Sequence, residues 1–185
     1  VLAKGGPKKL ADLTVAGFVH ETASESVAPG GGSVAANLGA LGAALGTMVA
    51  NLSAHKPGWD DRWEEFSDWA VKGKVCHDEL IRLIDADTDA FNGIMAAIRM
   101  PKSTDAEQAA RAEAMEAATC VAIDIPLRVM QVSLDSMETI RAMAKIGNPA
   151  SASDAGVGAL CARSAVIGAE LNVRINVKDL TSEAT

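Results

Sequence analysis

Apolar residues recur at intervals of three and four along most of this chain, which is the spacing of one face of an α-helix. The pattern is clearest between residues 33 and 55, at Leu38, Leu41, Leu45, Met48, Val49 and Leu52. β-branched residues are scattered and do not alternate with polar ones, so the period of a half-buried strand is missing. The periodicity therefore predicts an all-α protein.

Glycine, proline and capping residues divide the first half of this pattern into helices. We expect a first helix from about residue 13 to residue 24, with Thr14 in position to cap it. After the break at residues 28–32, Ser33 is expected to cap a second helix that ends near His55. A third helical region spans about residues 60–97, and the acidic run at 85–89 leaves open whether it is one helix or two.

The second half contains an equally clear set of start and stop signals. Thr104 and Glu107 have the spacing of a capping box. Pro126 lacks a backbone donor and is expected to kink or split the helix that contains it. Residues 147–149 should end that helix, and Ser153 with Asp154 should cap a last one to about residue 173. The sequence thus predicts a compact bundle of about six to eight helices in a single domain, residues 1–185.

Composition narrows the classes of partner. Asp and Glu number 24 against 17 Lys and Arg, for a net charge of −7, which disfavours a nucleic-acid partner. Residues 26–54 carry no charge and are long enough to span a bilayer. Gly39, Gly42 and Gly46 dilute that stretch, so we expect a helix buried in the bundle and no membrane partner. Because so uncharged a stretch is a poor surface helix, a dimer or higher oligomer is expected to cover what the bundle leaves exposed.

Location and metal content follow from further features. The N-terminal residues are polar and basic with no long apolar run behind them, so we expect no secretory signal and a cytoplasmic protein. Val1 is not an initiator methionine, which leaves open a domain cut from a longer chain. The three cysteines lie far apart and no Cys/His cluster has ligand spacing, so no metal site is expected.

Two segments carry candidate chemistry. Gly30, Gly31 and Gly32 precede a helix N-terminus, where free backbone N–H groups and the helix dipole favour negative charge. We expect Gly31 to need a positive φ, so that a β-branched residue there would block a ligand. Asp85, Asp87 and Asp89 are spaced by two and cannot share one helix face. A flexible turn and solvated acidic residues are the alternative interpretations of these two segments.

Asp87 differs from its two acidic neighbours in its expected surroundings. In a helix it shares a face with Leu83, Phe91 and Ile94, which form a partly apolar stripe. A carboxylate on such a stripe is desolvated, and its pKa should rise toward the working pH. Asp87 is therefore the expected proton-transfer residue of the three.

Several runs, in order, resemble the formimidoyltetrahydrofolate cyclodeaminase and methenyltetrahydrofolate cyclohydrolase family. The first covers residues 18–36 with its Ala-Pro-Gly-Gly-Gly-Ser core, and Met48-Val-Ala-Asn-Leu follows. The later ones lie at residues 83–91 with Met100-Pro-Lys, at 147–158 and at 171–176. Glu170 departs from the pattern, because an apolar residue is common at its position.

The resemblance implies an all-α, dimeric protein with its folate cleft near the subunit interface. It implies that Gly30, Gly31, Gly32 and Ser33 line the folate site and that Asp87 is catalytic. Further substrate-binding candidates that it implies are Phe91, Lys102, Asn148 and Asp154. Lys102 is the candidate for the folate glutamate tail. The implied partners are tetrahydrofolate derivatives, including polyglutamylated ones, and a formiminotransferase domain in the same chain, with no cofactor beyond the folate.

The resemblance implies one of two reactions at a shared site. A cyclodeaminase converts 5-formimidoyltetrahydrofolate to 5,10-methenyltetrahydrofolate and ammonia, and a cyclohydrolase converts the methenyl compound to 10-formyltetrahydrofolate. The Glu-Thr-Ala-Ser-Glu-Ser run at residues 21–26 and the Leu-Ser-Ala-His-Lys run at 52–56 favour the cyclodeaminase, because they most resemble members fused to a formiminotransferase. A non-catalytic helical oligomerisation module stays open as a different class.

Overall fold

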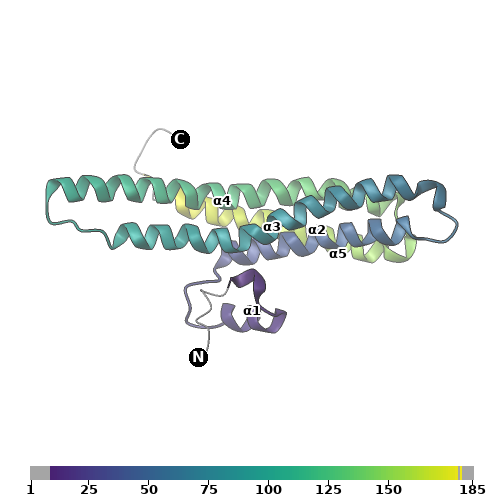
Figure 1. Ribbon diagram of the computed structural model, residues 1–185, viewed down its shortest axis with the longest axis horizontal. Coiled ribbons are helices and arrows are strands. Elements are labelled where there is room, and N and C mark those ends of the chain that lie inside the picture. The colour runs from purple at the N-terminus through teal and green to yellow at the C-terminus, as the bar shows by residue number, and fades with distance from the viewer. Residues whose placement is uncertain (1–8, 179, 181–185) are drawn as a thin grey trace, which may run out of the picture.

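Four long helices lie side by side in an elongated bundle in the computed structural model, which describes residues 9–178 and 180 (Figure 1). They are α2 (Gly31–Ala54), α3 (Trp63–Ile98), α4 (Asp105–Ile146) and α5 (Ala152–Val177). The short helix α1 (Val15–Thr22) lies beside the bundle, and the 3-10 turns are η1 (Leu10–Asp12), η2 (Asp60–Arg62) and η3 (Pro149–Ser151). The described part of the chain contains no strand, so the all-α prediction is confirmed.

The described residues form five α-helices, four in the bundle and α1 beside it, where the sequence predicted six to eight. The acidic run at 85–89 does not interrupt α3, because Leu83, Ile84 and Ala90 on its other faces are buried in the bundle. Packing of these apolar side chains keeps the helix continuous, as is common where tertiary contacts override local preference.

Pro126 neither ends nor splits α4, so of the two expected effects, a kink or a split, the split does not occur. A proline removes the N–H that would bond the carbonyl four residues earlier, here that of Ala122. In the structure Asn176 of α5 donates its side-chain Nδ2 to this carbonyl, at 2.7 Å. The helix therefore continues because a neighbouring helix supplies the missing donor.

The capping predictions are partly correct. Thr14 caps α1 by accepting from the N–H of Gly17 at 3.0 Å, and Thr104 forms the predicted capping box with Glu107. Ser33 is not a cap, because α2 already begins at Gly31 and the Ser33 side chain is buried against α3. The last helix likewise begins at Ala152, before the predicted caps at residues 153 and 154, because η3 leads directly into it.

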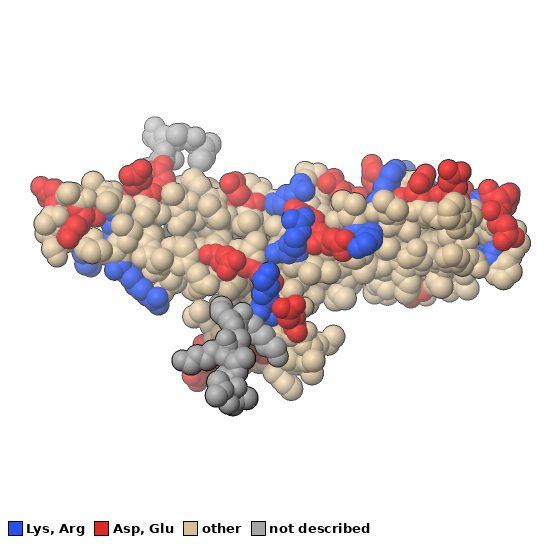
Figure 2. All heavy atoms as spheres, in the orientation of Figure 1, with Lys and Arg blue, Asp and Glu red and all other residues tan. Residues whose placement is uncertain are grey.

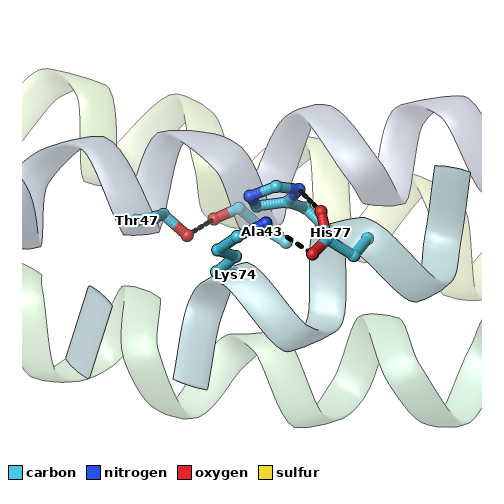
Figure 3. Close-up of polar contacts among 5 residues, drawn as sticks. Ala43, Thr47, Lys74 and His77 are labelled. Carbon is cyan, nitrogen blue, oxygen red and sulfur yellow. Dashed lines mark hydrogen bonds and ion pairs between the residues drawn. The ribbon is translucent and has the colours of Figure 1, made fainter. Parts of the chain in front are cut away.

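Small residues allow α2 to occupy the centre of the bundle. A Cβ at Gly42 would come within 2.8 Å of the Gly158 carbonyl oxygen and 2.9 Å of the Ala162 nitrogen. On the α3 side, Gly73 faces the Thr47 hydroxyl, and a Cβ at Gly73 would overlap that oxygen. Figure 3 shows Thr47 donating to the Ala43 carbonyl within α2, at 2.8 Å. These contacts bring α2 within backbone contact of its neighbours.

Apolar length alone does not distinguish this core helix from a membrane span. Both α2 and α4 contain stretches long and apolar enough to cross a bilayer, and 61% of the α2 stretch is buried inside the bundle. Figure 2 shows Lys and Arg side chains scattered among Asp and Glu on the face in view. That face shows no gathered basic surface of the kind that nucleic-acid binding needs.

We predict that Gly42→Ala lowers the free energy of unfolding by roughly 1–3 kcal/mol, the usual cost of overpacking a tight interface. The added methyl group would meet backbone atoms of α5, which cannot rotate away. Urea unfolding followed by circular dichroism measures the change.

The matched control is Gly156→Ala in α5, where an added Cβ meets nothing within 4 Å. This variant should be stabilised by about 0.5–1 kcal/mol, because alanine is the better helix former. Equal effects of the two substitutions would contradict the close α2–α5 packing.

Candidate functional site

A cleft of about 250 Å³ lies where α2 begins, and we call it the glycine-loop cleft. Its walls come from the loop before α2 and from all four long helices. The lining residues are Val27, Ala28, Gly30, Gly31, Gly32, Asp87, Thr88, Ala90, Phe91, Ile94, Ala122, Asn172 and Asn176. Figure 1 shows the start of α2, the C-terminal part of α3 and the last turns of α5 meeting in this part of the bundle.

Asp87 of α3 lies directly against the first turn of α2. A Cβ at Gly32 would overlap the carboxyl oxygen Oδ1 and come within 2.6 Å of Cγ. Glycine is therefore required at position 32 for space, since every other residue would displace the carboxyl group.

Ser33 holds the same carboxyl group from the other side. Its hydroxyl lies 2.9 Å from Asp87 Oδ2 and 3.0 Å from the Ile84 carbonyl oxygen. The hydroxyl has one hydrogen, which it donates to one of these acceptors at a time. If Asp87 carries a proton, it can donate to Ser33 while Ser33 donates to Ile84, so both protonation states keep a hydrogen bond.

Burial raises the pKa of the half-buried Asp87 above the ordinary value of an aspartate. Hydrogen bonds from the Ser33 hydroxyl and from the Ser33 backbone N–H act in the opposite direction and lower it. Desolvation is the larger effect, because a carboxylate loses more water than these two donors replace. The rise that the apolar stripe predicted is confirmed in direction.

The other two aspartates have different surroundings. The Asp85 carboxylate accepts the backbone N–H of Leu10 at 2.7 Å and so anchors η1 on α3. Asp89 is exposed and, like Asp85, lines a separate groove on the side of η1. Of the three acids, Asp87 alone lines the glycine-loop cleft, as the sequence analysis expects.

The glycine loop is built differently from the prediction. Gly58 has the one positive φ among the described residues, so Gly31 is not in the left-handed region. A Cβ at Gly31 would make ordinary contacts at 3.6 Å and 3.7 Å with the Asn172 amide. Space at Gly32, not the φ of Gly31, is what requires glycine in this loop.

The structure brings some predicted site residues together and separates others. Gly30, Gly31, Gly32 and Phe91 line the cleft with Asp87, and Ser33 lies behind it. Lys102 is exposed in the turn between α3 and α4. The four residues of α3 after Ile94, which also lines the cleft, extend about 6 Å beyond the cleft toward it.

Asn148 and Asp154 do not reach the cleft of their own chain. The Asn148 N–H donates to Ser53 Oγ at 2.8 Å, near the C-terminal end of α2, whereas the cleft lies at its N-terminal end. At 1.5 Å per residue, the helix separates them by about 30 Å. Within one chain Asn148 has a structural function: its side chain caps η3 by accepting from the Ala150 N–H.

Asn172 and Asn176 of α5 line the cleft, although they are not among the site residues predicted from the sequence. Their spacing of four puts both on one face of a helix, which is the signal that could have found them. Glu170, the departure from the family pattern, lies on the surface and pairs with Arg174, so it leaves the packing undisturbed.

The cleft can hold a neutral or cationic polar group and exchange a proton with it. Its lining contains no Lys, Arg or His among the described residues, and it offers one carboxyl group and two side-chain amides. The positive end of α2 is already in contact with the carboxyl group of Asp87. This chemistry fits proton transfer at a nitrogen better than binding of a phosphate.

Comparisons with known proteins match this chain over nearly its whole length. A family model described as Formiminotransferase-cyclodeaminase matches residues 14–185. The formimidoyltransferase-cyclodeaminase of Gallus gallus is 37% identical over 176 residues, which are 95% of this chain and 32% of that protein. This chain thus spans about a third of the length of that relative.

Two further relatives are closer to this chain in length. The methenyltetrahydrofolate cyclohydrolase of Methylorubrum extorquens is 36% identical over 92% of this chain and 82% of its own. The crystal structure of a formiminotetrahydrofolate cyclodeaminase from Thermotoga maritima superposes with a TM-score of 0.81 at 27% identity. That match covers 95% of this chain and 83% of the Thermotoga chain.

The raised pKa of Asp87 predicts a defined pH dependence of stability. A carboxyl whose pKa is higher in the folded than in the unfolded state stabilises the fold while protonated. That contribution is lost as the pH rises from the unfolded value, near 3.8, through the raised folded value. Asp87→Asn removes this titration, so the stability of the variant relative to the wild type should increase with pH across that window.

Urea unfolding at a series of pH values measures this difference. Asp89→Asn is the control, because Asp89 is exposed and outside the cleft. A difference between Asp87→Asn and the wild type that is constant with pH, or that falls as pH rises, would show that the carboxyl is not desolvated.

Proposed function

This chain belongs to the formiminotransferase-cyclodeaminase family, and on that premise we propose that it is a formimidoyltetrahydrofolate cyclodeaminase. The proposed substrate is 5-formimidoyltetrahydrofolate and the products are 5,10-methenyltetrahydrofolate and ammonia. The observation that carries the proposal is the Asp87 carboxyl group, half-buried in the cleft with a raised pKa.

The proposed reaction transfers one proton between two nitrogens. N10 attacks the formimidoyl carbon on N5, the new N10–C bond closes the ring, and the bond from that carbon to the outer nitrogen breaks. The amidine reacts in its protonated form, whose outer nitrogen already carries two hydrogens, so the proton lost by N10 is the one that this nitrogen still needs to depart as ammonia, and the positive charge stays on the methenyl product. One carboxyl group with a pKa near the working pH can accept the first proton and donate the second.

Asp87 can also act on the charge of the reacting carbon. The protonated amidine and the methenyl product are both cationic, and an ionised carboxylate in a desolvated cleft stabilises such a charge more strongly than in water. The proposed reaction forms and breaks only carbon–nitrogen bonds and transfers protons, so it calls for no cofactor beyond the folate.

Methenyltetrahydrofolate cyclohydrolase is the second candidate. The observation that favours it is the relative from Methylorubrum extorquens, which bears that name and which this chain covers over 82% of its length. That reaction adds water to the same methenyl carbon, so the same cleft and the same carboxyl group serve it. The names of these relatives speak against a non-catalytic oligomerisation module.

Absorbance of the methenyl compound tests both candidates and the role of Asp87. With 5-formimidoyltetrahydrofolate as substrate, a cyclodeaminase should produce the methenyl absorbance band. With the methenyl compound as substrate, a cyclohydrolase should remove this band faster than buffer alone does.

We predict that Asp87→Asn lowers turnover by roughly 10²–10⁴, the usual contribution of one acid–base group. The loss should appear in the rate constant more than in folate binding.

Asp89→Asn is the control in this assay, since it removes an exposed carboxylate two residues away. Wild-type protein inactive in both assays contradicts the proposed function. Near-normal turnover of Asp87→Asn, or its unfolding, contradicts the role of Asp87 alone.

We propose that Lys102 contacts the folate glutamate tail. Lys102 lies in the turn at the end of the bundle toward which α3 extends from the cleft, and Figure 2 shows Lys and Arg side chains at that end. A glutamate tail that leaves the cleft along α3 would reach Lys102.

Lys102→Ala should therefore weaken the binding of polyglutamylated folate severalfold more than that of monoglutamylated folate in a competition assay. Lys72→Ala, in the other half of α3, is the control and should not. Equal weakening of both forms would show that the tail lies elsewhere.

We also propose that the chain forms a dimer through α2. Three large apolar side chains of this helix stay exposed, Leu41 at 52%, Met48 at 37% and Leu52 at 46%. Beside them is a groove of about 400 Å³ that His77 of α3 also lines, and Figure 3 shows the His77 ring beside α2.

Sedimentation should show a dimer at micromolar concentration, and Leu41→Glu should dissociate it. Leu134→Glu on α4, also exposed, is the control, and a monomeric wild type would refute the interface.

A further inference from the structure

We propose that Asn172 and Asn176 select the substrate by accepting hydrogen bonds from the amino-pyrimidine edge of its pterin ring, and that Pro126 positions Asn176 for this. The proposal rests on the folate function proposed above. It adds two specificity-determining residues and one positioning residue, none of which the sequence analysis selected for the site.

The backbone fixes which way each amide faces. Asn176 Nδ2 lies 2.7 Å from the Ala122 carbonyl oxygen, and Asn172 Nδ2 lies 2.9 Å from that of Gly168. A carbonyl oxygen only accepts hydrogen bonds, so the nitrogen of each amide must face it. Each Oδ1 therefore lies on the other side of its amide.

These oxygens are available to a ligand. Both asparagines line the glycine-loop cleft, and no described residue donates a hydrogen bond to either Oδ1. The two residues are one helical turn apart on the same face of α5, so their amides form a pair. Together with the Asp87 carboxyl group, these two oxygens give the cleft three side-chain groups that can accept hydrogen bonds.

Pro126 is the origin of the Asn176 orientation. Within α4 the carbonyl of Ala122 would bond to the N–H of residue 126, and proline has none. The carbonyl is thus left for Asn176, which crosses from α5 to reach it. Any other residue at position 126 would supply the helical N–H and compete with the amide for this acceptor.

A pterin presents the complementary chemistry. Its 2-amino group and N3–H are donors on one edge of a flat ring, and they pair with acceptors held in a partly apolar cleft. Phe91, Ile94 and Ala90 supply the apolar part of this cleft. A ligand that lacked the donors would leave the asparagine oxygens unpaired and desolvated, which is how a hydrogen-bonding site rejects a close analogue.

The test compares two stable ligands by calorimetry on the full chain. One is 5-formyltetrahydrofolate, whose formyl oxygen stands in for the formimidoyl nitrogen, and the other is its 2-desamino-2-methyl analogue. The wild type should bind the first more tightly by roughly 10-fold to 100-fold, the range for a lost hydrogen bond to a buried polar group. In Asn172→Leu and Asn176→Leu this ratio should fall toward one.

Pro126→Ala tests the positioning without removing any cleft side chain. It restores the helical N–H, so α4 should remain helical and the protein should keep its unfolding midpoint. The ratio of the two affinities should nevertheless fall severalfold, which a purely structural role of Pro126 would not produce. Asn92→Ala, an exposed asparagine of α3 outside the cleft, is the control and should keep the wild-type ratio.

The outcomes separate this inference from the proposed function. A wild type that binds folate and turns it over but does not discriminate the analogue overturns the inference and leaves the function standing. A ratio that survives both asparagine variants and falls in Asp87→Asn also overturns it, because Asp87 is then the acceptor. A wild type that neither binds nor converts folate overturns both.

Discussion

The contact between the Asp87 carboxyl group and the first turn of α2 determines both the cleft and its chemistry. Gly32 provides the space, since a Cβ there would overlap the carboxyl group, and Ser33 supplies the hydrogen bond. The positive end of a 24-residue helix is thus in contact with a carboxyl group of the protein itself. The free N–H groups of a glycine-rich turn would otherwise favour a ligand anion. This contact instead places a desolvated carboxyl group at the wall of the cleft.

The close packing of the bundle keeps this contact in place. Because α2 carries glycine where it crosses α5 and places its own Thr47 against Gly73 of α3, its backbone has little freedom to shift. Desolvation of Asp87 depends on that rigidity, since a loosened first turn would admit water and lower the pKa of the carboxyl group. The same principle operates at Pro126, where a missing N–H is satisfied by a side chain of the neighbouring helix. At Gly32 the missing Cβ leaves room for the Asp87 carboxyl group, and at Pro126 the missing N–H leaves a carbonyl for the Asn176 amide.

Local patterns predicted most of the fold and the centre of the site. The period of the apolar residues indicated helices, the Thr104 capping box marked the start of α4, and the stripe through Leu83 and Phe91 distinguished Asp87 from its neighbours. The number of helices was wrong because neither the acidic run at 85–89 nor Pro126 divides its helix, and both outcomes depend on packing against neighbouring helices.

The remaining site residues required three-dimensional information. Asn172 and Asn176 lie in the run at residues 171–176 that resembles the family, but neither that run nor their interval of four shows that both line the cleft. Asn148 and Asp154 were selected because their motif is typical of the family, but membership of a motif says nothing about distance. Asn148 packs against Ser53 at the far end of α2, about 30 Å from the cleft by helix length. The order of the motifs along the chain therefore identified the family, but it could not show where these residues lie in space.

The pH dependence of kcat/KM for methenyl formation tests the central claim most directly, because it reports the ionisation of the acid–base group in the free enzyme. Measured from about pH 4 to about pH 9, the wild type should lose activity toward acid with a pKa above the ordinary carboxyl range. The residual activity of Asp87→Asn should lack that limb. An acid limb of the same pKa in both proteins would contradict the account, since another group would then carry the proton.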